Sequence, residues 1–564
     1  MLGLFKQIRL LGLLGSVALA GCGGDVDSQS SAAPAQSLAQ RAGAPLFEGM
    51  GDYYMPITTA DRDAQRYFDQ GMVLAFGFNH AESIRSFRAA QTLDPTCAMC
   101  FWGEALATGP NINVTSNGKA VMTPTERADA RAAIDQALAL MDGVSPKEQD
   151  WIRALDQRYD GQADTPRDLL DRAWANALAD MASRYPNDTT VASVYAEALM
   201  NTMPWDYWGP NGEAKPDTQA VIASLEAVMA ADPDHPLALH LYIHALEASS
   251  NAAKAEPAAD RLANLVPGSG HLVHMPSHIY FRVGRYQDSA LANIRAAEVD
   301  EAYIKQCNAQ GFYPALYYPH NIHFLWASAT MQGQSALSLD SARRVVANVR
   351  VEQVEQFPTI QFFRTVPILS LVRFARWEEI LQEPDPYEPF AFARAIWHYG
   401  RGVANAALGD AESALIELAA IEALEPEVDE IFMGNVYPAR DLLEIAKSLL
   451  KGEIAYRSGD AVSAVLPFEE AVALQDALPY TEPPFWYYPT RQSLGAALLA
   501  SNRLAEAQAV FEEDLEQYPM NGWSMFGLAE ALRRQGDEAG AEQMTARFET
   551  VWQFADVSLA TSIL

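Results

Sequence analysis

The stretch KGEIAYRSGDAVSAVLPFEEA, residues 451–471, carries small and aromatic residues at spacings that indicate the fold class. Counted from residue 445, Gly452, Gly459, Ala464, Phe468 and Ala471 stand at positions 8, 15, 20, 24 and 27. The same spacing recurs at Gly402, Gly409, Ala414, Leu418 and Pro426, at Gly495, Ala507, Phe511 and Pro519, at Gly536 and Ala541, and at Gly71, Phe87, Ala90 and Pro95. Small residues at recurring spacings allow neighbouring helices to approach closely, and a recurring proline at position 32 ends a helix.

This period resembles the tetratricopeptide repeat, in which two antiparallel helices form a unit of 34 residues. The resemblance implies an all-α solenoid of helical hairpins, wound as a right-handed superhelix, whose repeats contact mainly their neighbours. Between the clear matches, segments such as 123–141 and 165–185 open with Thr-Pro and carry apolar residues at helical spacing. Weaker repeat character around 350–390 predicts two halves, an N-terminal array over residues 61–350 and a C-terminal array over 391–564, with a joint at 351–390.

The first residues, MLGLFKQIRLLGLLGSVALAGC, have the form of a secretory signal, with Lys6 and Arg9 before an apolar run. The run Leu19-Ala20-Gly21-Cys22 resembles a bacterial lipobox, which implies that residues 1–21 are removed and that Cys22 carries lipid. Gly23 after the cysteine, in place of aspartate, favours the outer membrane. Residues 22–60 then form a flexible tether. We expect a lipid-anchored envelope protein, with the solenoid in the periplasm or at the cell surface, that touches the membrane only through its anchor.

Composition narrows the functional classes. A formal net charge of −32 repels phosphate backbones, so nucleic acid is not an expected partner, whereas cations are favoured. The chain contains no nucleotide-binding glycine loop, GxSxG elbow or HExxH motif, so no nucleotide cofactor is expected.

Histidine is rare and clustered: seven of the ten histidines fall within residues 240–323. Pro233 and Pro267 both fit position 32, which starts new repeats at residues 236 and 270, and Gly333 sets the following repeat to start at residue 319. In this frame His240, His274 and His323 occupy position 5, His244 and His278 occupy position 9, and His271 and His320 occupy position 2. Positions 2, 5 and 9 share one face of a helix, the face that lines the concave groove of tetratricopeptide proteins.

Neutral imidazole is the commonest ligand for transition metals, so these seven histidines predict a metal site for copper, zinc or iron. Glu247, one turn after His244, is a candidate for a further ligand. Two alternatives remain open, a histidine-lined site for an organic ligand without metal, and a purely structural role. Pro276 interrupts the helix that carries His274 and His278, so this helix either kinks at the proline or starts there.

Two further groups of residues are candidates. Cys97 and Cys100 form a CxxC pair that suits a disulfide, a redox pair or a metal clip, and we expect it to be oxidised or oxidisable after export. Trp486, Tyr487, Tyr488 and Arg491 form an aromatic and cationic cluster, which is either core between repeats or a platform for an organic ligand or peptide.

Four longer stretches, at residues 97–113, 271–286, 318–323 and 484–498, resemble a group of large exported bacterial tetratricopeptide proteins over most of the chain. That group has no established activity. The sequence therefore predicts an envelope lipoprotein that binds a transition metal. The alternatives are a scaffold for protein or peptide partners in an envelope assembly, and a metal-dependent oxidase or hydrolase.

Overall fold

The computed structural model describes residues 37–116, 119–209, 212–307, 309, 312–356, 358–386, 389–428 and 437–564. The predicted signal segment 1–21, the predicted lipid attachment site Cys22 and residues 23–36 of the predicted tether lie outside the described residues. These three predictions therefore stay predictions. The predicted boundaries of the two arrays and of the joint also stay predictions.

The described chain is built almost entirely of helices, as the repeat pattern predicts. The helices of the first part are α1 (Leu38–Ala42), α2 (Arg62–Phe76), α3 (His80–Leu93), α4 (Ala98–Thr108), α5 (Pro124–Leu140), α6 (Pro146–Asp156), α7 (Arg167–Arg184), α8 (Thr189–Asn201), α9 (Pro216–Ala231), α10 (Pro236–Leu246), α11 (Glu256–Leu262), α12 (Gly270–His274), α13 (Pro276–Arg282), α14 (Tyr286–Cys307) and α15 (Tyr318–Met331). Those that follow are α16 (Ser335–Ala347), α17 (Val351–Gln356), α18 (Val366–Arg373), α19 (Trp377–Gln382), α20 (Ala391–Ala407), α21 (Ala411–Leu424), α23 (Ala439–Arg457), α24 (Ala461–Asp476), α25 (Arg491–Ala500), α26 (Leu504–Gln517), α27 (Gly522–Gln535) and α28 (Glu538–Val551).

Short elements join these helices. They are the single turns η1 (Met141–Gly143), η2 (Ala252–Ala255), η5 (Glu425–Glu427) and η7 (Trp552–Phe554), the longer 3-10 segment η4 (Pro358–Thr365), and the wide π-turn η3 (Tyr313–Tyr317) that leads into α15. The strands β1 (Thr115–Ser116) and β2 (Lys119–Ala120) form a two-residue antiparallel hairpin, in which Thr115 pairs with Ala120. In the described chain, the helices lack the combination of length and apolar character needed to cross a bilayer.

The repeat spacing is explained by how the aromatic residue of one helix fits against glycines of its neighbours. A Cβ atom on Gly495 of α25 would lie 2.3 Å from the Phe511 ring of α26, and one on Gly527 of α27 would lie 2.2 Å from the same ring. The ring is thus held between two backbones that approach closely only because they lack side chains. Phe87 is held in the same way between Gly71 of α2 and Gly103 of α4.

A Gly-Asp pair forms the turn within several hairpins. Gly459 has a φ of 88°, a left-handed conformation that ends α23, and the next residue, Asp460, accepts a hydrogen bond from the backbone N–H of Ser463 to begin α24. Asp410 and Asp537 cap α21 and α28 in the same way. One dipeptide therefore both stops the first helix and starts the second.

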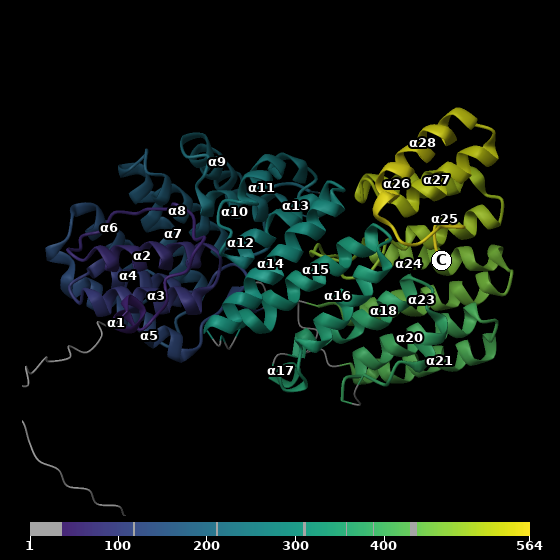
Figure 1. Cartoon of the computed structure of the whole chain (residues 1–564), viewed down its shortest axis with the longest axis horizontal. Helices are drawn as coiled ribbons and strands as arrows, with labels where there is room; N and C mark the ends of the chain where they lie inside the picture. Colours follow the sequence, from purple (N-terminus) through teal and green to yellow (C-terminus); the bar gives the residue numbers. More distant parts are fainter. Residues whose placement is uncertain are drawn as a thin grey trace, which may run out of the picture.

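The stacked hairpins form the predicted solenoid, in which some distant repeats also meet. Figure 1 shows α2 to α15 towards one end of an elongated molecule and α20 to α28 towards the other. Within the first part α2 packs against α10, and the carbonyl of Phe76 contacts His240, which lies 164 positions further along the chain. Between the two parts, Trp523 of α27 donates a hydrogen bond to the carbonyl of Thr330 in α15. One hydrophobic core extends from Met55 to Tyr317 and another from Phe281 to Ala531.

Candidate metal centre

Four helical segments carry the clustered histidines. His240 and His244 lie on α10, His271 and His274 on α12, His278 on α13 and His320 on α15. The helix that contains Pro276 is interrupted but does not turn away, because Met275 keeps right-handed helical angles between α12 and α13. The sequence predicts either a kink or a new helix start at this proline. In the structure a new helix, α13, starts at Pro276 and continues the path of α12.

Ring nitrogens of the histidines converge in two groups. His240, His244 and His271 form the first histidine group, and His274, His278 and His320 form the second histidine group. In each group one ring nitrogen from every member lies within 4.8 Å of the others. The groups adjoin, since the ring centres of His244 and His278 are 5.9 Å apart.

Glu247 connects the two groups. Its Oε1 accepts a hydrogen bond from Nδ1 of His244 at 2.6 Å, and its Oε2 accepts one from Nδ1 of His278 at 2.5 Å. The carboxylate is fully buried, which alone would raise its pKa, but the charge and hydrogen bonds of His278 and His244 lower the pKa below its usual value. Glu247 was a candidate ligand by sequence; in the structure it instead orients two imidazoles, the role that carboxylates play behind metal-bound histidines.

Hydrogen bonds from Nδ1 fix the tautomers of two further rings, those of His240 and His274. In the first group Nδ1 of His240 donates to the carbonyl of Phe76 at 2.7 Å. In the second, Nδ1 of His274 donates to Oδ1 of Asn293 at 2.6 Å, and the amide nitrogen of Asn293 donates to the carbonyl of Ser289, which sets the orientation of the amide. Each Nδ1 therefore carries the proton, and each Nε2 presents a lone pair.

In the first histidine group these lone pairs accept no hydrogen bond from the described residues. Nε2 of His240, Nε2 of His244 and both ring nitrogens of His271 are buried without a hydrogen-bond partner among the described residues. Unpartnered buried polar atoms are rare because each costs about 1–3 kcal/mol. Burial and the neighbouring histidines lower the pKa of His240 and His271 well below 6.5, so protons do not fill the site near neutral pH.

In the second histidine group two lone pairs face each other. Nε2 of His274 lies 2.8 Å from Nε2 of His278, and both Nδ1 atoms already donate elsewhere. Such a contact is stable only with a cation between the nitrogens or with an extra proton on one ring. Burial lowers the pKa of His278, but the charge and hydrogen bond of Glu247 together with the charge of Glu482 outweigh it and the net pKa is raised, so His278 is the ring that accepts this proton when no metal is present.

Both groups fit a transition-metal ion. A tetrahedral ion with metal–nitrogen bonds of about 2.1 Å holds its ligand atoms about 3.4 Å apart, so the rings need small shifts to close on it. Three neutral imidazoles leave a fourth position open, as in catalytic zinc sites.

Aromatic side chains cover the histidines. The histidine face, predicted to line a concave groove, is therefore closed in the structure. Phe78 lies against His240, His244 and His271, with its ring centre 4.6 Å from that of His240. Trp205 stands edge-on to His244 at 5.2 Å. His240, His244 and His271 are consequently buried, because α2 and its following turn pack over α10, and His274 and His278 are buried against Phe324 of α15.

No protein-family model and no curated protein sequence matches the chain. Similar solved structures include the P58(IPK) TPR domain, at 12% identity over 59% of this chain and 89% of that chain with a TM-score of 0.19. Others are yeast Tom70, at 12% identity over 86% and 93% with a TM-score of 0.25, and the human IFIT1 dimer with m7Gppp-AAAA, at 12% identity over 76% and 87% with a TM-score of 0.31.

The fold itself is decided by the internal packing of the repeats. Phe87 and Phe511 stand at the same repeat position, and each fills the space over a glycine of its own hairpin and of the next helix. The fold is of the tetratricopeptide type. Stacked helical hairpins of this type present extended surfaces suited to binding partner proteins.

One predicted ligand in this tetratricopeptide scaffold lies apart from both groups. The ring of His323 stacks on Trp326 at 5.1 Å and meets Phe362 and Phe363 on its other sides. Its burial lowers its pKa to about 3, so it is a neutral histidine of the core. We therefore leave His323 out of the metal centre. His320 and His323 stand three positions apart on one face of α15, but only His320 contacts His274 and His278, whereas His323 contacts η4.

Cys97 and Cys100 are joined by a disulfide at the start of α4. They lie in a small core with Tyr67 and belong to neither histidine group. That the pair is oxidised in the exported protein stays a prediction.

The predicted ligand platform is mostly packed between repeats. Trp486, Tyr487 and Tyr488 are buried, and the hydroxyls of Tyr487 and Tyr399 lie 3.0 Å apart. Arg491 forms ion pairs with Asp476 and Glu513. Trp486 lines a cavity, so ligand binding near this cluster stays a prediction.

Sequence reasoning missed the residues that complete the centre from other repeats. Phe78 and Trp205 have φ values of 56° and 62°, conformations that are strained for residues with bulky side chains. No pattern in the sequence marks this strain. Asn293 is a further example, because it lies on α14, the second helix of a hairpin, where the repeat pattern expects packing residues.

Proposed function

We propose that the protein is a tetratricopeptide-type metalloprotein of the cell envelope, and that each histidine group holds one transition-metal ion, copper, zinc or iron. The observation that carries this proposal is that ring nitrogens of His240, His244 and His271 are buried without a hydrogen-bond donor among the described residues, next to the opposed Nε2 atoms of His274 and His278. A purely structural role would leave the nitrogens of the first histidine group unsatisfied.

The residues of the chain would prepare the centre for its ions. Glu247, the Phe76 carbonyl and Asn293 hold four imidazoles in the tautomer that binds metal through Nε2. Phe78 and Trp205 shield the first group from water. A bound copper or iron would supply redox chemistry, and zinc would supply a Lewis acid. The open fourth position at each group favours a metal-dependent oxidase or hydrolase as a second candidate function over a purely structural site.

The test is metal content of the purified protein, expressed with each metal supplied in turn. We expect wild type to retain up to about two ions per chain and the double variant His244→Ala, His278→Ala, which removes one ligand from each group, to retain almost none. His323→Asn is the matched control, since it removes a buried histidine outside both groups and should leave the metal content unchanged. Wild type that retains less than about 0.1 ion per chain with every metal would overturn the proposal.

The envelope location is tested separately. The sequence of residues 1–22 supports export and lipidation of Cys22. Cys22→Ser should release the protein from the membrane fraction or leave its signal segment attached. A membrane fraction and mature mass equal to those of wild type would contradict the anchor.

A further inference from the structure

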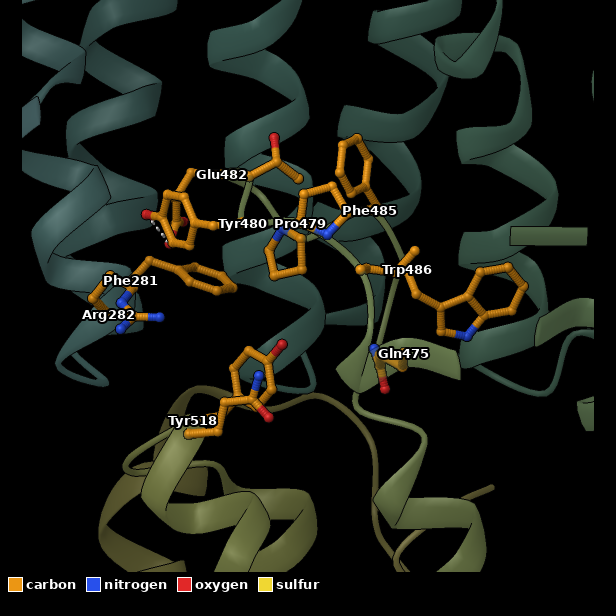
Figure 2. Close-up of a pocket in the computed structure, with 13 residues that line it drawn as sticks. Phe281, Arg282, Gln475, Pro479, Tyr480, Glu482, Phe485, Trp486 and Tyr518 are labelled. Atoms are coloured by element: carbon orange, nitrogen blue, oxygen red, sulfur yellow. Dashed lines mark hydrogen bonds between the residues drawn. The ribbon is translucent and has the colours of Figure 1, made fainter. Parts of the chain in front are cut away.

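A cavity lies beside the second histidine group, where the two parts of the molecule meet. In Figure 2 Phe281 and Arg282 approach it from α13, Tyr518 from the end of α26, and Pro479 to Trp486 from the loop between α24 and α25. Its volume is about 90 Å³. An engineered cavity of about 150 Å³ accepts benzene, so this smaller cavity suits a ligand of at most about six non-hydrogen atoms.

Two charged side chains in its wall have free hydrogen-bonding atoms. Nε of Arg282 and Oε2 of Glu482 are buried without a hydrogen-bond partner among the described residues. Arg282 is held in place, because its Nη2 donates to the carbonyl of Ser249 at 3.1 Å and its guanidinium lies over the Tyr480 ring. Burial raises the pKa of Glu482 to about 7, although Arg282 opposes this, so the carboxyl can either donate or accept near neutral pH.

Aromatic and apolar groups form most of the remaining wall, with Phe281, Phe485 and Tyr518 among them. A wall of this kind with one guanidinium and one carboxyl selects a ligand that has a carboxylate and a hydrogen-bond donor close together. We propose that the cavity binds a small organic carboxylate with a hydroxyl or amino group on the adjacent carbon, with the carboxylate on Arg282 and the donor on Glu482.

Tyr480 links this ligand site to the histidines. Its hydroxyl lies 2.9 Å from Oε1 of Glu482 and 3.3 Å from Oε2 of Glu247, the oxygen that also accepts from His278. A ligand that engages Glu482 changes how Tyr480 shares its proton between the two carboxylates. The occupied cavity therefore alters the support that Glu247 gives to the metal centre; this coupling, unlike the binding itself, rests on the proposed function.

Binding is tested on the full chain without metal, by calorimetry with four probes of similar size. Lactate and alanine carry both groups, propionate lacks the donor and 1,2-propanediol lacks the carboxylate. We expect lactate or alanine to bind at least about tenfold more tightly than propionate, because a buried carboxyl left unpaired is costly, and we expect no binding of the diol. Whether lactate or alanine binds more tightly identifies the donor.

Variants of the two charged residues assign the contacts. Arg282→Gln and the milder Arg282→Lys should each weaken binding of the preferred probe at least about tenfold, since the guanidinium fork is lost in both. Glu482→Gln should reduce the preference over propionate. Arg285→Gln is the matched control, because it removes a nearby positive charge that pairs with Glu256, Asp260 and Asp288 on the surface. No binding of any probe at about 10 mM, or equal binding by wild type and both Arg282 variants, would overturn the proposal.

The coupling is tested by metal titration with and without the preferred probe. We expect saturation with the probe to change the metal affinity of wild type at least about fivefold, and to have no effect in Tyr480→Phe. Probe binding in metal-free protein with no change in metal affinity would overturn the coupling alone. Failure of metal binding with intact probe binding would instead overturn the proposed function and leave the ligand site standing.

Discussion

Glu247 is the single side chain on which both histidine groups depend. It is fully buried, and its two oxygens each accept a short hydrogen bond, one from His244 and one from His278. Because it holds both rings in the metal-binding tautomer, its removal affects both groups together.

We predict that Glu247→Gln lowers the affinity of the protein for its metal by about 10- to 100-fold while leaving the fold intact. The amide keeps the size of the side chain but offers one acceptor in place of two. Competition against a chelator of known affinity measures the change. The matched control is Glu417→Gln, since Glu417 accepts a hydrogen bond from His398 at 2.5 Å outside both histidine groups. Equal affinities in the two variants would show that Glu247 does not support the centre.

His235 is a buried histidine whose task is structural. It begins α10, where its Nδ1 accepts from the backbone N–H of Ala238, and its ring lies 3.3 Å from the hydroxyl of Ser193. Burial lowers its pKa to about 4, against the opposing effect of Asp232. In the unfolded chain the same ring titrates at 6.5.

The sign of the pH dependence follows from this difference. Between pH 6.5 and 4 the unfolded state binds a proton that the folded state does not, so the free energy of unfolding falls as the pH falls, by about 1.4 kcal/mol per unit. We predict that His235→Asn, which keeps the helix cap, reduces the slope by about this amount. Urea denaturation of metal-free protein at pH 6.5, 5.5 and 4.5 measures it. Parallel pH profiles for wild type and variant would contradict the assignment.

At the scale of the elements, three hairpins are set by the contact of a glycine with an aromatic ring, Phe87, Phe468 or Phe511. Gly452 of α23 faces Phe468 of α24, and a Cβ atom added to Gly452 would lie 2.3 Å from the ring. The two helix axes can approach closely only while this position lacks a side chain.

We predict that Gly452→Ala destabilises the protein by about 1–3 kcal/mol, because the ring or the helix must move. Gly143→Ala is the control, since a Cβ atom there meets nothing within 4 Å and the residue has an ordinary φ. Thermal unfolding followed by circular dichroism compares the two. A melting temperature for Gly452→Ala at or above that of Gly143→Ala would refute the packing argument.

At the scale of the whole molecule, segments far apart in the chain complete one another. The side chain of Asp556 accepts hydrogen bonds from the backbone N–H groups of Ser335 and Ala336 at 2.6 and 2.9 Å, and so caps α16 from more than two hundred residues away. Gln334, the residue that precedes α16, provides no such cap. The end of the chain therefore fastens the second part of the molecule to its middle.

We predict that Asp556→Ala destabilises the protein by about 0.5–2 kcal/mol and exposes the segment after α28 to proteolysis. Asp556→Asn keeps an acceptor and should lie close to wild type. Limited proteolysis with mass spectrometry, together with thermal unfolding, distinguishes these outcomes. Equal cleavage rates in all three proteins would show that the contact does not fasten the segment.

The sequence by itself determined the class of fold and most of the candidate ligands. Gly452, Phe468 and their counterparts predict the hairpins because the spacing of small and large residues along a helix is a local property. The same frame brought His240 and His244 onto one face, and His274 and His278 onto the equivalent face one repeat later, so proximity followed from helix geometry alone.

Only the tertiary structure decided that the histidine face is closed, divided into two groups and joined to a cavity. Phe78 and Trp205 reach the histidines, and Tyr480 reaches Glu247, from other repeats, over separations that no local pattern encodes. The curvature that brings α2 onto α10 sums small rotations at every hairpin, each set by packing. For the same reason Glu247 became a shared acceptor and His323 left the centre, since both outcomes depend on how neighbouring helices are rotated.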